Sequence, residues 1–180
     1  MKPNRVRIIG GAWRSRRVSF PPRPDLRPTP DRVRETLFNW LGQDLTGMTC
    51  LDLFAGSGVL GFEAASRGAR RVVMVERDPL VLRALAASRE ALEARVVELR
   101  RADALEFLRA DGERYDVVFV DPPYRSELWP RVAPLLPPRL APRALVYLEG
   151  ARRTGPPPGW QAWKQGRAGQ VAFQLLKRAE

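Results

Sequence analysis

A cluster of hydrogen-bond acceptors follows one apolar segment of the chain. Asp121, Pro122, Pro123 and Tyr124 come directly after the run YDVVFV at residues 115–120. Two adjacent prolines remove two backbone N–H donors, so carbonyl oxygens and a carboxylate remain, and these accept hydrogen bonds. The ring of Tyr124 adds a flat surface beside them. This combination predicts a binding site for a flat ligand that is rich in N–H groups.

A glycine-rich loop forms a second candidate site. Gly56, Gly58 and Gly61 lie in the segment LDLFAGSGVLG, between an expected strand and an expected helix. Small residues at such a turn let a ligand approach the backbone N–H groups of a helix N-terminus, and the spacing matches the dinucleotide-binding fingerprint. The spacing alone also fits a tight strand-to-helix turn without a ligand.

Three acids are expected at the carboxyl edge of the same sheet. Asp52 lies four residues before the first glycine, Glu76 ends the second strand and Asp103 ends the third. An acid before the loop can accept from an ammonium group, one after the second strand can bind ribose hydroxyls, and one after the third can bind the amine of adenine. Together they favour S-adenosylmethionine over NAD, whose pyrophosphate has no use for an acid before the loop. Each acid could instead cap a helix or lie in solvent.

A methyl donor with a sulfonium group would explain why hydrogen-bond acceptors cluster at Asp121 and Pro122. Such a methyl group is already electrophilic, so catalysis needs a nucleophile held in line with the carbon–sulfur bond. The exocyclic amine of a base is a poor nucleophile, because its lone pair is delocalised into the ring. The Asp121 carboxylate and the Pro122 carbonyl can take both amine hydrogens, while Tyr124 stacks on the unstacked base. The alternative is a rigid loop in which Tyr124 only packs.

Composition limits the classes of function. The 180 residues, 44% of them hydrophobic, suffice for one domain with an arm, and the net charge of +11 favours polyanionic partners. The sequence has no His and one cysteine, Cys50, which excludes His-based triads and a Cys/His metal cluster, so we expect no metal. No apolar run approaches the roughly 20 residues that span a bilayer. A cytoplasmic, monomeric protein without a membrane partner is expected.

The spacing of apolar residues predicts the elements that position these groups. From residue 49 to 150, short apolar runs alternate with helical patterns, which predicts an α/β fold with a parallel sheet covered on both faces. Residues 5–20 predict two strands around Gly10 and Gly11. A proline-rich connector follows at 21–30, then a helix capped by Asp31. We expect a basic N-terminal hairpin arm at 1–30, a cofactor-binding domain at 31–180, and a closing hairpin near the C-terminus.

Four segments together resemble a known family: RIIGGAWRSRRV, LRPTPDRVRETLFNWL, CLDLFAGSGVLGFEAASRGA and DVVFVDPPY. They are similar to the bacterial RsmD family of 16S ribosomal RNA (guanine-N2)-methyltransferases, over nearly the whole chain and most weakly after residue 150. The resemblance implies a Rossmann-like class I methyltransferase fold with seven strands, the last antiparallel. It implies S-adenosylmethionine as donor, S-adenosylhomocysteine as product, and a guanine in the small ribosomal subunit or its assembly intermediate as acceptor.

The resemblance also implies roles for individual residues. The catalytic candidates are Asp121, Pro122 and Tyr124. The cofactor-binding candidates are Asp52, Phe54, Gly56, Gly58, Glu76, Arg77, Asp103 and Ala104, with Thr29, Arg32 and Arg34 from the segment that would close over the methionine end. Separately from the resemblance, the substrate-binding candidates are Pro123 of the acceptor cluster and, from the basic arm, Arg7, Trp13, Arg14, Arg16 and Arg17.

The basic arm is expected to contact RNA. Residues 1–34 contain ten basic and two acidic side chains, and Trp13 and Phe20 lie among the arginines. Phosphate contacts would explain this charge, although a solvated surface would also show it.

Two further functions share parts of this pattern of motifs and charge. An adenine-N6 methyltransferase acting on RNA or DNA needs the same amine acceptors, and a non-catalytic RNA-binding assembly protein would show the same charge.

Overall fold

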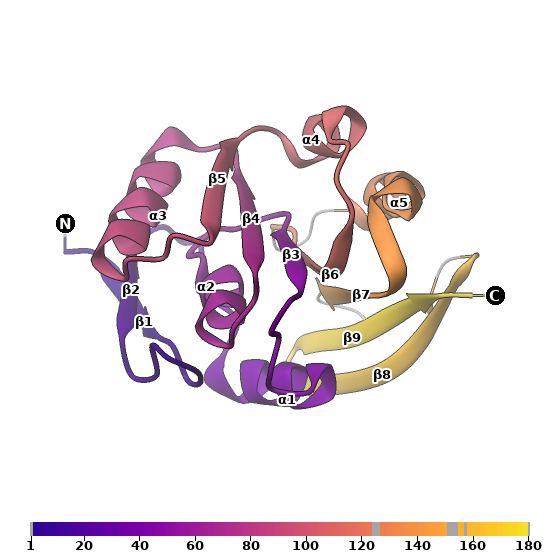
Figure 1. Cartoon of the computed structure of the whole chain (residues 1–180), viewed down its shortest axis with the longest axis horizontal. Coiled ribbons are helices and arrows are strands. Elements are labelled where there is room, and N and C mark those ends of the chain that lie inside the picture. The colour runs from indigo at the N-terminus through magenta and orange to yellow at the C-terminus, as the bar shows by residue number, and fades with distance from the viewer. Residues whose placement is uncertain (1, 124–126, 151–154, 157, 180) are drawn as a thin grey trace.

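A single sheet of seven strands forms the centre of the computed structural model, which describes residues 2–123, 127–150, 155, 156 and 158–179. The strand order is β5-β4-β3-β6-β7-β9-β8 (Figure 1). Five strands run parallel, namely β3 (Thr49–Asp52), β4 (Arg71–Glu76), β5 (Val97–Arg101), β6 (Tyr115–Val120) and β7 (Leu140–Gly150). The last strand, β9 (Val171–Arg178), runs against both β7 and β8 (Trp160–Ala168). The predicted α/β fold with an antiparallel last strand is confirmed.

Helices cover both faces of this sheet (Figure 1). One face packs against α1 (Asp31–Leu41), α2 (Val59–Ser66) and α3 (Pro79–Ala91). The other packs against α4 (Ala104–Ala110), the single turn α5 (Trp129–Val132) and the 3₁₀ turns η1 (Ala133–Leu135) and η2 (Pro137–Arg139). Among the described residues, no helix combines the length and apolarity needed to cross a membrane.

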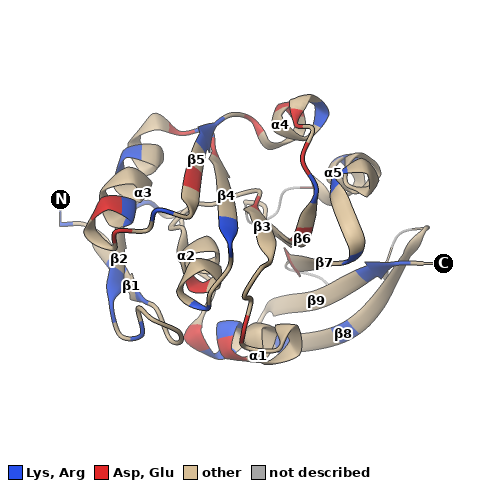
Figure 2. Cartoon of the chain, in the orientation of Figure 1, with Lys and Arg blue, Asp and Glu red and all other residues tan. Residues whose placement is uncertain are grey.

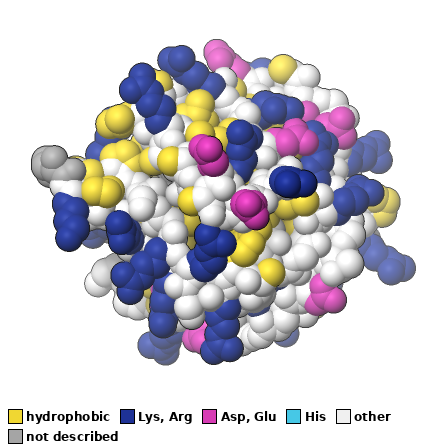
Figure 3. Space-filling view, turned by 60° about the vertical axis from the view of Figure 1, so that its left-hand side comes forward, with side chains coloured by type: hydrophobic (Ala, Val, Ile, Leu, Met, Phe, Trp, Pro, Cys, Tyr) yellow, Lys and Arg dark blue, Asp and Glu magenta, His cyan; other side chains and the backbone are white. Residues whose placement is uncertain are grey.

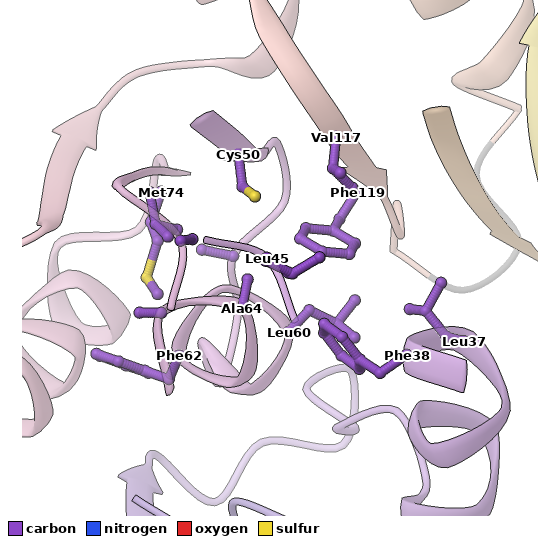
Figure 4. Close-up of a cluster of buried hydrophobic side chains, with 14 of the residues drawn as sticks. Leu37, Phe38, Leu45, Cys50, Leu60, Phe62, Ala64, Met74, Val117 and Phe119 are labelled. Atoms are coloured by element: carbon purple, nitrogen blue, oxygen red, sulfur yellow. The ribbon is translucent and has the colours of Figure 1, made fainter. Parts of the chain in front are cut away.

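The alternation of side chains along each strand divides the core into two layers. Cys50 and Phe119 point to the face covered by α1 and α2, while their neighbours Leu51 and Val118 point to the face of α4. Figure 4 shows the first layer, in which Phe38 of α1 lies close to Phe119, with ring centroids 6.0 Å apart. Both faces of the central strands are therefore buried, as near-continuous apolar runs predict.

The N-terminal arm is a hairpin that joins the first core layer. Strands β1 (Asn4–Arg7) and β2 (Arg17–Phe20) pair antiparallel, as predicted. Ile8 and Val18 are fully buried within the core that includes α2 and α3. The division of the chain at residue 30 stays a prediction.

A buried ion pair ties the arm and α1 to α2. Arg34 and Glu63 are both fully buried, and the guanidinium Nη1 lies 2.9 Å from the carboxylate. The backbone N–H groups of Ile9 and Gly10 donate to the same carboxylate, and Arg67 pairs with it at 3.1 Å. Among the described residues, the partners of this acid come from the arm, from α1 and from the C-cap of α2, so the Glu63 carboxylate fixes how these three segments meet.

The predicted helix cap at Asp31 is wrong. Pro30 occupies the N-cap position of α1 and makes no side-chain capping bond. Asp31 lies one residue further on, within the first turn, where its carboxylate pairs with Arg7 at 2.8 Å and also with Arg34. The nearby guanidinium groups therefore bind the carboxylate in place of the helix amides. Gly42 ends the helix in a left-handed conformation, which favours glycine.

Replacing Arg34 with Met should lower the free energy of unfolding by about 3 kcal/mol or more, because the buried Glu63 carboxylate loses its main partner. Urea denaturation followed by circular dichroism measures this change. Arg32→Met is the matched control, because Arg32 is exposed on the same helix. Equal denaturation midpoints for the two variants would contradict the structural role of the pair.

Candidate active site

The glycine-rich loop joins β3 to α2 at the carboxyl edge of the sheet. Gly58 occupies the N-cap of α2 with φ of 80°, a left-handed conformation that favours glycine. A side chain on Gly61 would collide with Met74 and would come within 3.2 Å of the Asp52 carboxylate. The Gly61 N–H instead donates to Asp52 at 3.0 Å. The glycines therefore allow the first turn of α2 to approach β3 closely.

Asp52 is a buried acid, only 1% exposed. Burial raises its pKa to about 7, the nearby Glu76 charge adds to this effect, and the Gly61 N–H opposes it. No cation pairs with this carboxylate among the described residues. A positively charged ligand group at this position would relieve the cost of ionising the acid.

Glu76 ends β4, as predicted, whereas β5 ends at Arg101 and Asp103 follows two residues later as the N-cap of α4. Both acids bind backbone N–H groups. Glu76 accepts from Gly56 at 3.2 Å and from Asp78 at 2.9 Å, so it connects the glycine loop to the start of α3. Asp103 caps α4 by accepting from Leu105 at 2.9 Å, with a second bond to the next residue. The helix-cap alternative for Asp103 is thus present in the structure, and its role toward adenine stays a prediction.

The proline-rich connector lies over the glycine loop. Leu26 approaches Gly56 so closely that a side chain there would meet its Cδ1 atom at 3.0 Å. Arg23 pairs with Asp78, which caps α3 through the N–H groups of Leu80 and Val81. Sequence reasoning missed the helix cap formed by Asp78, although an acid directly before Pro79 at a helix start is a known capping pattern. It also missed the pairing of Asp78 with Arg23.

The turn after β6 that begins at Asp121, here called the acceptor turn, lies beside an acid on the neighbouring strand β7. Val120 pairs with Leu148 in the parallel ladder, so Asp121 and Glu149 follow side by side. The Thr29 hydroxyl lies 2.9 Å from Glu149 Oε2 and 3.3 Å from Asp121 Oδ2. The Tyr147 hydroxyl also donates to Glu149 Oε2, at 2.8 Å. Sequence reasoning missed Glu149 and Tyr147, although the strand segment RALVYLEG also ends in an acid.

Burial raises the pKa of both acids, and neighbouring charges add to this for Asp121. Burial raises the pKa of Asp121 well above its usual range, and the charges of Glu149 and Asp52 add to it. Burial also raises the pKa of Glu149, while the hydroxyls of Tyr147 and Thr29 lower it. The carboxyl edge is therefore an acidic environment within a basic protein, suited to ligand groups that are cationic or donate hydrogen bonds.

The remaining predicted site residues differ in their placement. Thr29 lies within hydrogen-bond distance of Asp121 and Glu149, as described above. Arg34, in contrast, is fully buried, and its guanidinium group donates to the carboxylates of Glu63 and Asp31 and to the carbonyls of Thr29 and Arg7. It therefore offers no free cation to a ligand. Pro122 is partly buried and Pro123 exposed, and Tyr124 lies outside the described residues. Of the added cofactor candidates, Phe54 is partly buried, Arg77 is exposed and Ala104 is buried.

The described residues contain no group that could form a metal site. No group of three potential metal-ligating side chains occurs among the residues that the structure describes.

The candidate RNA-contacting residues form a mixed surface on the hairpin. Arg14 and Arg17 are exposed, Arg7 pairs with Asp31, and Arg16 donates to the Ala91 carbonyl at 2.6 Å. Trp13 is partly buried against the core. Figure 2 shows basic segments along the hairpin, and Figure 3, with this side turned forward, shows Lys and Arg spread over the face.

A second basic region was missed by sequence analysis. A cleft of about 440 Å³ at the opposite, amino edge of the sheet is lined by Thr49, Arg70, Arg71, Arg95, Val96, Glu98, Glu113 and Arg114. Its four arginines are scattered along the sequence, and Arg71 is held by Glu98 at 2.7 Å. The cleft is separated by the length of the strands from the acids described above.

Known proteins resemble this chain over nearly its whole length. The family model described as conserved hypothetical protein 95 matches residues 6–177. Ribosomal RNA small subunit methyltransferase D of Escherichia coli strain K12 is 42% identical, and the match covers 98% of this chain and 94% of the relative.

Solved structures give the same picture. YhhF of Escherichia coli superimposes with a TM-score of 0.87 at 42% identity, covering 97% of this chain and 98% of that one. An RNA methyltransferase of Salinibacter ruber, solved in complex with S-adenosyl-L-homocysteine, superimposes with a TM-score of 0.63 at 25% identity, covering 83% and 92%. The chain therefore belongs to the RsmD family of methyltransferases.

Proposed function

We propose that the protein transfers a methyl group from S-adenosylmethionine to the exocyclic N2 amine of a guanine in 16S ribosomal RNA, within the small subunit or its assembly intermediate. The main support is the position of Asp121, which follows the strand paired directly with the one that ends at Asp52. The acceptor turn and the glycine loop are thus neighbours on one sheet edge. The name of the Escherichia coli relative supports the choice of RNA.

The residues at the glycine loop fit the proposed methyl donor. Asp52 is buried without a cationic partner among the described residues, so an ammonium group would compensate its charge. Leu26 packs closely on Gly56, and Leu85 and Phe62 pack closely on Gly58, so these glycines let the loop backbone lie close to its neighbours. Glu76, at the end of β4, is the candidate for binding the ribose hydroxyls. When bound, S-adenosylmethionine supplies an electrophilic methyl group on a sulfonium. The Salinibacter relative with bound S-adenosyl-L-homocysteine supports this choice.

The acceptor turn would prepare the amine for attack. Asp121 accepts one amine hydrogen and the Pro122 carbonyl accepts the other, which frees the nitrogen lone pair. As the nitrogen–carbon bond forms and the carbon–sulfur bond breaks, the amine becomes positively charged and loses a proton. The raised pKa of Asp121 suits a carboxylate that takes up this proton.

Methyl transfer to small subunits tests the proposal directly. Subunits from a strain that lacks this protein are incubated with labelled S-adenosylmethionine, and the RNA is digested to nucleosides. We expect the label in N2-methylguanosine. Label in N6-methyladenosine would retain the site chemistry but contradict the guanine assignment, and absence of cofactor binding would favour a non-catalytic assembly protein.

The same assay tests the role of Asp121. Asp121→Ala should lower turnover about 100-fold or more, because a group that stabilises the transition state is lost. Cofactor affinity, measured by calorimetry, should change little. Glu90→Ala on the exposed side of α3 is the control. Full activity of the Asp121 variant would exclude its role in the amine chemistry.

Cofactor affinity should depend on pH through Asp52. The ammonium group binds the ionised acid, and the raised pKa of about 7 means that binding must displace a proton at lower pH. Affinity should therefore rise between about pH 6 and pH 8 and then level off, up to the pH at which the ammonium itself deprotonates. Asp52→Asn should bind weakly with a flat profile. A flat profile for the unaltered protein would exclude this contact.

The exposed arginines of the arm should determine the salt dependence of binding. Arg14→Gln combined with Arg17→Gln should weaken binding to small subunits and reduce the slope of log affinity against log salt by about 0.7–0.9 for each lost phosphate contact. Arg109→Gln combined with Arg131→Gln removes the same charge elsewhere and serves as the control. Identical slopes for both double variants would show that the arm is not the contact surface.

A further inference from the structure

We propose that Glu149 selects guanine over adenine by accepting a hydrogen bond from the N1–H group of the base. This inference rests on the proposed function, because it concerns the base that presents its amine to Asp121. It assigns a specificity role to a residue of β7 outside both the glycine loop and the acceptor turn.

The register of the sheet places Glu149 beside Asp121. Val120 pairs with Leu148 across the parallel strands β6 and β7, and the two acids follow directly after this pair. One oxygen of each carboxylate lies within 3.3 Å of the same Thr29 hydroxyl oxygen. The two acids are therefore held next to each other at the end of the ladder.

Each acid keeps one oxygen for a ligand. Glu149 uses Oε2 to accept from both Tyr147 and Thr29, and Asp121 uses Oδ2 toward Thr29. Glu149 Oε1 and Asp121 Oδ1 have no hydrogen-bond partner among the described residues. Two adjacent acceptors thus remain at the edge where the base would bind.

Two adjacent acceptors match guanine and not adenine. The edge of guanine presents the N2 amine next to the N1–H group, so two donors lie side by side. In adenine, the N6 amine lies next to N1, which is an acceptor and would face the Glu149 carboxylate. A site built to accept a hydrogen bond rejects a base that cannot donate it, because its own polar group is left unpaired.

The hydroxyls of Tyr147 and Thr29 both donate to Glu149 Oε2 and so fix the orientation of the carboxyl group. Burial raises the pKa of this acid, and the two hydroxyls oppose that rise. A bound N1–H donor would further favour the ionised form. If Glu149 only fastened the connector through Thr29, its second oxygen would have no bearing on the choice of base.

Glu149→Gln separates these two roles. The side-chain carbonyl of Gln can still accept from Tyr147 and Thr29, which preserves the local structure. Its amide then replaces the free oxygen with an N–H donor. Such a donor matches N1 of 2,6-diaminopurine, a base that has the same N2 amine as guanine but no hydrogen on N1.

The experiment uses small subunits reconstituted with 16S RNA that contains either guanine or 2,6-diaminopurine at the methylated position. The unaltered protein should methylate guanine about 10- to 100-fold faster, the range expected from one base-edge contact. Glu149→Gln should lose or reverse this preference. Glu90→Gln, on the exposed side of α3, should behave as the unaltered protein.

Three results would overturn the inference. Equal rates of the unaltered protein on both bases would show that N1–H is not read, whatever the variant does. An unchanged guanine preference in Glu149→Gln would assign the discrimination to another group. Failure of the unaltered protein to methylate the guanine subunits would instead refute the proposed function itself.

Discussion

The parallel pairing of β3, β6 and β7 is the constraint on which the candidate site depends. Parallel strands end at a common edge, so Asp52, Asp121 and Glu149 meet there although nearly a hundred residues separate the first from the last. Gathering acids in a partly buried place is unfavourable, and the raised pKa values express this cost. A fold would retain such a cluster at a site where bound cations and hydrogen-bond donors compensate it.

The N-terminal segment completes this edge from outside the sheet. Arg34 and Glu63 anchor α1 and the hairpin to α2, and Arg34 also holds the Thr29 carbonyl at 3.0 Å. This anchoring brings the Thr29 hydroxyl to Asp121, which follows β6, and to Glu149, near the end of β7. The arm is thus a structural part of the site as well as a basic surface. Its packing helps to position Thr29, and its charge makes this surface basic.

Opposite charges are separated over the molecule. The net charge is +11, yet the carboxyl edge of the sheet is acidic. In the proposed function, a basic exterior would raise the local concentration of RNA phosphates, while the acidic site would attract an ammonium group and the N–H groups of a base. Such an arrangement would let one small domain bind a polyanion and a cationic cofactor without competition between them.

The sequence by itself determined the order of strands and helices, the glycine loop, the turn after β6 and the strand end at Glu76, because these depend on local periodicity and turn chemistry. Residue type did not reveal which polar groups meet across the fold. Asp31 pairs with Arg7 and Arg34 and does not cap its helix, and Arg34 is buried against Glu63. Glu149 became a site residue only through strand register, and the four-arginine cleft only through the packing of distant segments. Such partners are decided by the tertiary structure, because a side chain's contacts follow from the spatial arrangement of elements that are remote in sequence.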